Sequence, residues 1–252
     1  MILPTDLLIR PTVFDAFPEL KAAQSTRHGG VSPAPYNSLN LGKSTDDDPA
    51  NVAENRRRFC HAIGFRPEQT AWSKQVHGTE IKRVKEPGGS EGFDAFITNA
   101  QGILLCVSIA DCTPILIYDA GNKVLGAVHA GWKGAAGKLV RKTLEKMSET
   151  FGTQGAQCYA FVGACIDECS FEVGEEVALQ FKAPFKRFDP EKGKYFVDLK
   201  QDNRQQCLDF GIPASQIEVS PYSTYVHHQH FFSHRKDKGV TGRGMAVIGL
   251  ME

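Results

Sequence analysis

The sequence lacks the features that would place it in a membrane, in a disulfide framework or on nucleic acid. It has no run of about eighteen apolar residues, which excludes an ordinary transmembrane helix. Lys+Arg and Asp+Glu balance at 29 each, so no global field favours nucleic acid or an anionic membrane surface. The seven cysteines are an odd number without compact spacing, and reduced thiols suit a cytosolic enzyme.

The N-terminal segment also lacks the pattern of a secretory leader. Residues 1–17 have no basic lead and no long apolar stretch, and two prolines interrupt them. We therefore expect no signal peptide and a cytoplasmic protein. No internal repeat and no clear linker divides the 252 residues, of which 41% are hydrophobic. One domain over residues 1–252 is the prediction.

A long stretch of polar and small residues precedes the first predicted helix. Residues 25–49 are rich in Gly, Pro, Ser, Asn and Asp, which predicts a long loop. Loops of this length in a compact domain are often functional, and a disordered insertion is the alternative. A helix is predicted over 50–65, with Arg56 and Phe59 among the residues at helical spacing and Pro49 at its start.

Strands predominate in the rest of the chain. Apolar β-rich runs flank Ala110–Thr113. A helix with one apolar face is predicted after residue 138, a short helix over 172–181, and a further helix over 196–212 that ends at Gly211. Because the links include hairpins and crossovers, one domain with a mixed sheet is expected. Further strands are predicted over 70–84 with His77 near the middle, 123–131, 159–166, 217–235 and 244–250.

Three potential metal ligands lie at or beside the ends of predicted strands. They are His77, Cys112 and His129, and strand ends of one sheet can converge. Histidine and cysteine are the commonest zinc ligands, and catalytic zinc typically has three protein ligands and one open position. No compact spacing marks this trio, so a buried thiol with two structural histidines is the alternative.

Other polar clusters carry weaker signals. The segment 227–230, "HHQH", invites a metal interpretation, but alternating aromatic residues and histidines favour an exposed strand face. The segment 239–244, "GVTGRG", is not a dinucleotide fingerprint, because its glycine order is wrong and it precedes a strand. Arg27, Arg235 and Arg243 lie in glycine-rich loops, where they could bind phosphate or simply be solvated.

Six segments together resemble the YfiH-like family, the laccase-domain group labelled both polyphenol oxidoreductase and purine nucleoside phosphorylase. The resemblance runs from about residue 20 to the C-terminus, and the pair "ADC" and "VHAGW" is its most specific part. The segments occur in the family's order: "STRHGGVSPAPYNSLNLG" (25–42), "KQVHG" (74–78), "SIADCTPILIYD" (108–119), "AVHAGWKG" (127–134), "CSFEVGEEV" (169–177) and "FFSHRKDKGVTGRGMAVIGL" (231–250).

The resemblance implies a fold and a metal site. Family members have a single α+β domain, a mixed β-sandwich flanked by helices. Their zinc is held by two histidines and a cysteine, which correspond here to His77, Cys112 and His129. Asp111 is then expected to orient a ligand or to accept a proton. Copper could replace zinc, because it binds N/S sites more tightly.

The resemblance also implies an activity on purine nucleosides such as adenosine, inosine and methylthioadenosine. Phosphorolysis needs a phosphate held against the ribose C1′. Deamination has a route through a zinc-activated water that attacks C6 of adenine. The expected partners are therefore a nucleoside and phosphate, with no nucleic acid and no membrane, in a monomer or a dimer. The residues expected to bind substrate are Arg27, Asn40, Lys133, Arg235 and Arg243.

Two other functions remain open at this stage. A copper-dependent polyphenol oxidoreductase is disfavoured, because multicopper oxidases use more histidines than the eight present here. A cysteine hydrolase acting on peptidoglycan precursors would use Cys112 as nucleophile and His129 as base. Metal binding and nucleophilic attack are competing fates for one thiolate.

Overall fold

Two six-stranded sheets form the centre of the fold. The computed structural model describes residues 7–251, and positions 1–6 and 252 of the predicted single domain lie outside the described residues. The first sheet has the order β1 (Leu8–Ile9), β2 (Leu20–Ser25), β15 (Gly244–Leu250), β7 (Leu104–Ile109), β3 (Thr70–Lys74) and β5 (Gly88–Glu91). The second sheet has the order β14 (Ile217–Val219), β10 (Cys158–Val162), β8 (Thr113–Asp119), β9 (Val124–Ala130), β6 (Ala95–Thr98) and β4 (Ile81–Arg83).

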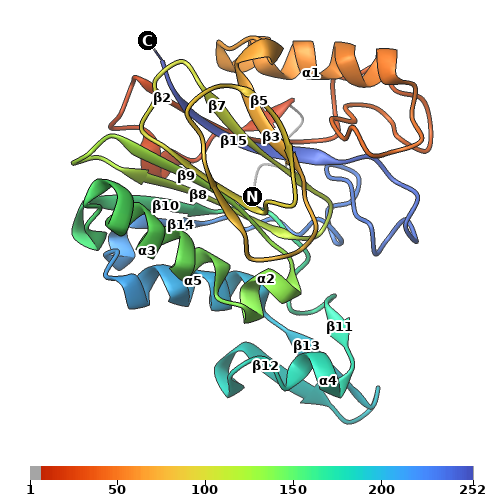
Figure 1. Ribbon diagram of the computed structural model, residues 1–252. Helices are drawn as coiled ribbons and strands as arrows, with labels where there is room; N and C mark the ends of the chain where they lie inside the picture. Colours follow the sequence, from red (N-terminus) through yellow and green to blue (C-terminus); the bar gives the residue numbers. More distant parts are fainter. Residues whose placement is uncertain (1–6, 252) are drawn as a thin grey trace.

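Helices cover the outer faces of both sheets, as Figure 1 shows. Helix α1 (Pro49–Ile63) packs on the first sheet through Phe59 and Ile63. Helices α3 (Leu139–Phe151) and α5 (Leu199–Phe210) pack on the second sheet. The predicted α+β fold, a mixed β-sandwich flanked by helices, is confirmed.

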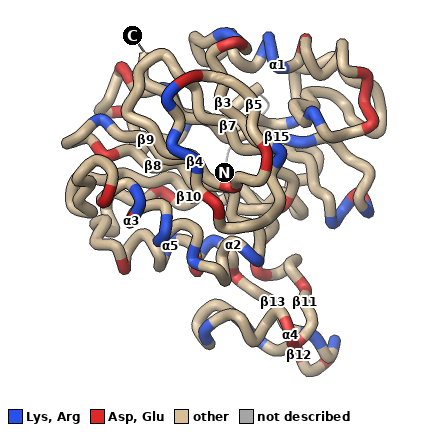
Figure 2. Tube along the Cα trace, in the orientation of Figure 1, with Lys and Arg blue, Asp and Glu red and all other residues tan. Residues whose placement is uncertain are grey.

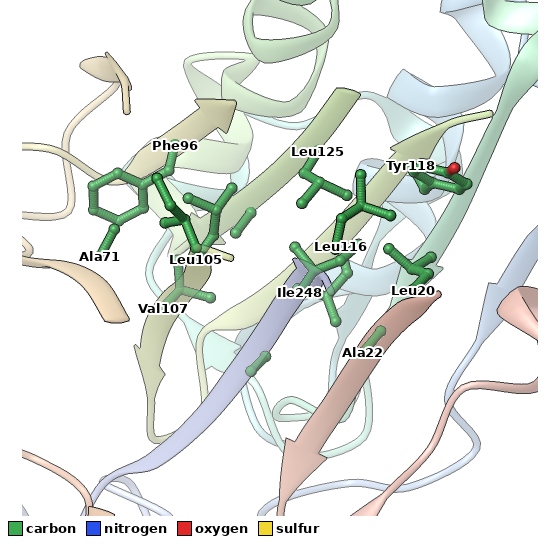
Figure 3. Close-up of a cluster of buried hydrophobic side chains, with 14 of the residues drawn as sticks. Leu20, Ala22, Ala71, Phe96, Leu105, Val107, Leu116, Tyr118, Leu125 and Ile248 are labelled. Carbon is green, nitrogen blue, oxygen red and sulfur yellow. The ribbon is translucent and has the colours of Figure 1, made fainter. Parts of the chain in front are cut away.

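The main core lies between the two sheets. Along β7, Leu105 and Val107 point into this core, whereas Leu104 and Cys106 point toward α1. This alternation is the two-residue period of a strand that is buried on both faces. Burying one leucine side chain contributes about 1.5–3 kcal/mol, so the interface is a major source of stability. Figure 3 shows Leu116 and Leu125 of the second sheet facing Ile248 of the first.

Local sequence signals mark the ends of α1 and α5. Asp48 precedes α1 and accepts a hydrogen bond from the amide of Ala50, and Pro49 occupies the first turn. Asp198 accepts from Gln201 at the start of α5. Gly64 and Gly211 end the two helices with φ of 86° and 102°, a conformation that favours glycine. The predicted end of the second helix at Gly211 is confirmed.

A small third sheet projects from the sandwich near α2 (Trp132–Ala136) (Figure 1). Its apolar contacts with α2 include Phe171 and Val197. The predicted short helix is present as α4. No helix among the described residues is long and apolar enough to cross a membrane. The third sheet has the order β11 (Glu172–Val173), β13 (Lys194–Val197) and β12 (Lys186–Asp189), and α4 spans Glu175–Ala178.

The prediction of one strand over 70–84 is wrong. The segment forms β3 and β4, which belong to different sheets. His77 lies in the connection between them, with a φ of 59° that cannot continue a strand. The chain therefore crosses from the first sheet to the second at this histidine.

The prediction of one strand over 217–235 is also wrong. Only Ile217–Val219 is a strand, and residues 223–230 form turns. The alternating aromatic residues and histidines that suggested a strand face lie in these turns, where the amide of His227 donates to the carbonyl of Ser223. The predicted helix over 196–212 starts three residues later, at Leu199, because Phe196 and Val197 pair within the third sheet.

One buried side chain links the two sheets. Gln24 of β2 is fully buried, and its amide donates to the carbonyl of Ala164 (3.0 Å) and accepts from the Ala164 amide (2.8 Å). We expect Gln24→Ala to lower the free energy of unfolding by about 2–4 kcal/mol, because two buried backbone groups lose their partner. Chemical denaturation measures this loss. Gln205→Ala is the control: it removes only a solvent-exposed hydrogen bond to Asp209 and should change stability by less than about 0.5 kcal/mol, and an equal effect of both substitutions would contradict the role of Gln24.

Candidate metal centre and cavity

The structure brings His77, Cys112 and His129 together. His77 comes from the β3–β4 connection, Cys112 from the β7–β8 connection and His129 from β9. Their donor atoms all lie within 4.8 Å of one another. Ligands that share one zinc ion have bonds of about 2.0–2.3 Å, so this spacing and this N/N/S donor set fit such an ion. His129 is buried, Cys112 is half-buried and His77 is exposed.

The close approach of these side chains depends on sheet register and on a glycine. In the β8–β9 pair Thr113 lies opposite Ala130, so Cys112 lies beside Gly131. A Cβ atom on Gly131 would be 3.0 Å from His77 Cδ2 and 3.1 Å from Cys112 Sγ. These contacts are tighter than ordinary packing allows, so residue 131 must be small for His77 and Cys112 to meet.

The buried carboxylate of Asp94 holds both histidines. Its Oδ1 accepts hydrogen bonds from His129 Nδ1 (2.8 Å) and from the His77 amide (3.0 Å). Its Oδ2 accepts from the Gly78 amide (2.8 Å) and the Val76 amide (3.2 Å). Because Nδ1 of His129 is used in this way, Nε2 is the nitrogen left to bind a metal. Asp94 was not among the predicted site residues, although it directly precedes the buried strand β6.

The carboxylate of Asp111 contacts a distant segment of the chain. Its Oδ1 accepts from the Thr224 hydroxyl (2.6 Å) and its Oδ2 accepts from the Arg235 amide (2.7 Å). The carboxylate therefore fixes the segment 224–235 against the site, and its role toward a ligand or a proton stays a prediction. Its φ of 85° is unusual for a residue other than glycine and turns the chain directly before Cys112.

Cys112 and His129 perturb each other strongly. Burial would raise the pKa of the Cys112 thiol, but the charge of His129 and hydrogen bonds from His129 and His77 lower it below its ordinary value. Burial would lower the pKa of His129, but Cys112 and Asp94 raise it. The pair therefore favours a thiolate, which is the form of cysteine that binds metals and attacks electrophiles.

A cavity of about 500 Å³ opens beside the three ligands. This volume is in the range of small-molecule sites. Part of its wall is apolar and aromatic, from Trp132, Ile166 and Phe171. Asp111 is the one carboxylate among the described lining residues, and five cationic side chains share the wall: Lys43, Arg56, Lys74, Arg235 and Arg243.

Two of the five predicted substrate-binding residues line this cavity. The guanidinium of Arg235 lies 5.4 Å from the centre of the Phe171 ring and donates to the carbonyl of Glu172 (3.1 Å). Arg243 donates to the carbonyl of Thr241 (2.7 Å). Burial lowers the pKa of Arg243, whereas Cys112 and Asp111 raise it, so this arginine faces the metal end of the cavity.

The other three are absent from the described cavity wall. Arg27 donates to the carbonyls of Asn37 (2.8 Å) and His228 (2.9 Å), so its guanidinium connects two loops. Lys133 lies over the Trp132 ring, with Nζ 5.6 Å from the ring centre.

Asn40 acts on the site through the backbone. It is fully buried, and its Oδ1 accepts from the amides of Gly42 (3.1 Å) and Arg243 (2.8 Å). It therefore positions Arg243 rather than lining the cavity itself. The loop at 25–49 contributes Gly42, Lys43 and Ser44 to the cavity wall.

The histidines of "HHQH" do not form a second metal site. Among the described residues, the groups that could hold a metal are the trio and the exposed set Asp167, Glu168 and Cys169. His230 instead pairs with His28, at 2.9 Å between Nδ1 and Nε2.

Comparisons with known proteins agree with this fold. A purine nucleoside phosphorylase of Deinococcus radiodurans is 41% identical over 90% of this chain and 88% of its own length. The purine nucleoside phosphorylase YfiH of Escherichia coli is 37% identical over 91% of this chain and 93% of its own length. The crystal structure of YlmD from Geobacillus stearothermophilus superposes with a TM-score of 0.92, at 31% identity, over 100% of this chain and 98% of that one. Residues 21–251 match the family model described as multi-copper polyphenol oxidoreductase laccase, and the chain belongs to that family.

Proposed function

We propose that this protein is a metal-dependent purine nucleoside phosphorylase that acts on adenosine, inosine and related nucleosides such as methylthioadenosine, with adenosine deamination as a companion activity. The observation that carries the proposal is one cavity that joins a His/Cys/His ligand set to aromatic side chains and to four cations without an ion pair among the described residues. Relatives of this chain that are named purine nucleoside phosphorylases support the choice of substrate.

The donor set favours zinc as the resident metal. Two imidazoles and a thiolate leave one coordination position open, as in catalytic zinc sites. Asp94 supports the site, because a carboxylate on the far nitrogen of a metal-binding histidine fixes the ring and raises its basicity. When bound, the metal would supply Lewis acidity next to the substrate. Copper fits the same donors, and the family's description names it.

The cavity residues suggest how phosphorolysis would proceed. The faces of Trp132 and Phe171 offer stacking surfaces for a purine base. Arg235 and Arg243 would hold phosphate so that one of its oxygens bonds to the ribose C1′ while the C1′–N bond breaks and the base leaves with the electron pair. Two fixed cations stabilise the negative charge of the phosphate in this geometry without reorganisation.

A cysteine hydrolase is the second candidate. Cys112 and His129 are directly hydrogen-bonded, which is the arrangement that activates a thiol nucleophile. In this case His129 would take the thiol proton and Cys112 would attack an acyl carbon, such as an amide of a peptidoglycan precursor. In the phosphorylase the Cys112 thiolate would be bound to a metal, whereas in the hydrolase it would be free to attack. Metal content and thiol reactivity therefore distinguish the two functions.

Alkylation of Cys112 tests the metal directly. We expect about one metal ion per chain, lost in Cys112→Ala, and slow labelling of Cys112 by iodoacetamide until a chelator is added, because a coordinated thiolate is not free to react. The experiment uses the Cys169→Ser background, because Cys169 is exposed and belongs to the second group that could hold a metal, so its labelling could also change with the chelator. Rapid labelling of a fully active, metal-free protein would instead establish the hydrolase.

Asp94→Asn tests the support of the two histidines. We expect the affinity for the metal to fall about 10- to 100-fold, since a ligand-orienting carboxylate is lost. Competition with a chromogenic chelator measures this affinity. Asp111→Asn is the matched control, because the carboxylate of Asp111 bonds to Thr224 and Arg235. Equal losses in both variants would show that Asp94 has no special role.

Arg235→Ala tests the phosphate position. We expect the KM for phosphate to rise about 10- to 100-fold and the KM for the nucleoside to change little, because a charge-assisted contact contributes about 1.5–3 kcal/mol. Steady-state kinetics with each substrate varied in turn gives both constants. Arg187→Ala on the third sheet is the control. If only the KM for the nucleoside rises, Arg235 contacts the base or the ribose and not the phosphate.

A further inference from the structure

A buried arginine without a full set of partners lies at one end of the cavity. Arg56 of α1 is only 7% exposed. Its Nη1 donates to the carbonyl of Leu41 (2.8 Å), but its Nη2 is buried and has no hydrogen-bond partner. A buried guanidinium nitrogen without an acceptor costs free energy, so native structures rarely retain one without a reason.

The charge of Arg56 is also uncompensated. Its neighbours on α1, Arg57 and Arg58, both form ion pairs with Glu54 (2.7 and 2.8 Å), whereas no ion pair within residues 7–251 includes Arg56. Helix α1 carries one acidic residue, Glu54, and three arginines at 56–58, and Figure 2 shows both signs of charge on it.

The ionisable side chains that could balance the charge of Arg56 from within the protein are two thiols, those of Cys60 and Cys106. Burial raises the pKa of Cys60 to about 11 and that of Cys106 further, so both are neutral and cannot balance the guanidinium.

A second cation lies beside Arg56. The Nζ atom of Lys43 is 4.1 Å from the centre of the Trp72 ring, and the Arg56 guanidinium is 5.9 Å from the same ring. The ring itself is closely packed, because a Cβ on Gly89 would come within 2.6 Å of Trp72 Cζ2. Lys43, like Arg56, has no ion pair in the described part of the chain. Two unpaired cations therefore share one aromatic wall.

Arg56 and Lys43 lie next to Arg243, the arginine that faces the metal end of the cavity. The amide of Leu41 donates to the carbonyl of Arg243 (2.9 Å), and the carbonyl of the same Leu41 accepts from Arg56. A Cβ on Gly42, directly before Lys43, would lie 2.7 Å from Arg243 Cγ. Arg56 and Lys43 therefore extend the cationic wall of the cavity beyond Arg243.

We propose that Arg56 and Lys43 form an oxyanion subsite that binds a phosphate group, either as free phosphate or as the ester of a phosphorylated nucleoside. A phosphate oxygen would accept the unused hydrogen bond of Arg56 Nη2 and balance both charges. The choice of adenosine compounds as probes rests on the proposed function, whereas the subsite itself rests on the contacts of Arg56 and Lys43.

Direct binding to the full-length, metal-loaded protein tests the subsite without turnover. Isothermal titration would compare inorganic phosphate, adenosine and adenosine 5′-monophosphate on the wild type and on Lys43→Ala. We expect Lys43→Ala to raise the Kd of a phosphate-bearing probe about 10- to 100-fold and to leave that of adenosine unchanged. Lys74→Ala is the matched control, because Lys74 also borders the cavity but is already paired with Glu91 (3.1 Å).

The pattern of losses identifies the source of the phosphate. Weaker binding of the monophosphate alone supports an ester, and weaker binding of inorganic phosphate as well supports free phosphate. Unchanged Kd values for both probes in Lys43→Ala, or no saturable binding of either to the wild type, would overturn the proposal. Arg56→Lys, checked for folding by circular dichroism, should show the same pattern. Failure of phosphorolysis would appear separately, as absence of adenosine turnover with phosphate.

Discussion

The carboxylate of Asp94 is the contact on which the candidate site depends. It is fully buried and accepts four hydrogen bonds, one from the His129 ring and three from the backbone of residues 76–78. A buried charge is tolerated only when it is satisfied in this way. The backbone it holds is the point where the chain crosses from the first sheet to the second, and His77 can keep its positive φ there because these amides are fixed.

The rest of the site follows from how the two sheets are joined. The β8–β9 register sets Cys112 beside Gly131, and the missing side chain of that glycine leaves room for His77. Asp111 then attaches the segment 224–235 to the same place through Thr224 and Arg235. His129 lies in a strand, and His77 and Cys112 lie in short connections that the hydrogen bonds of Asp94 and Asp111 hold in place. Such rigid support is what a metal centre requires of its protein.

Local patterns predicted the helices but not the contacts between distant segments. Two helix boundaries rest on local signals that the prediction used, Pro49 at the start of α1 and Gly211 at the end of α5. The trio was identified through family resemblance, since its spacing along the chain carries no signature. The role of Asp94 was missed, because its bond to His129 spans 35 residues. The segment 217–235 was misread, since alternating residue types there accompany turns that long-range contacts stabilise.

Charge placement explains how a chain with no net charge can present a cationic cavity. Acidic residues on the surface of α1 and α3 neutralise their neighbours, as Glu54 does for Arg57 and Arg58 and Glu145 does for Arg141. Exposed pairs of this kind contribute little to stability. In the cavity, the one lining carboxylate is committed to hydrogen bonds with Thr224 and Arg235. The lining carboxylate therefore does not neutralise the positive potential of the cations in the cavity. That potential is stronger in a partly buried site than in water, so it favours anionic groups.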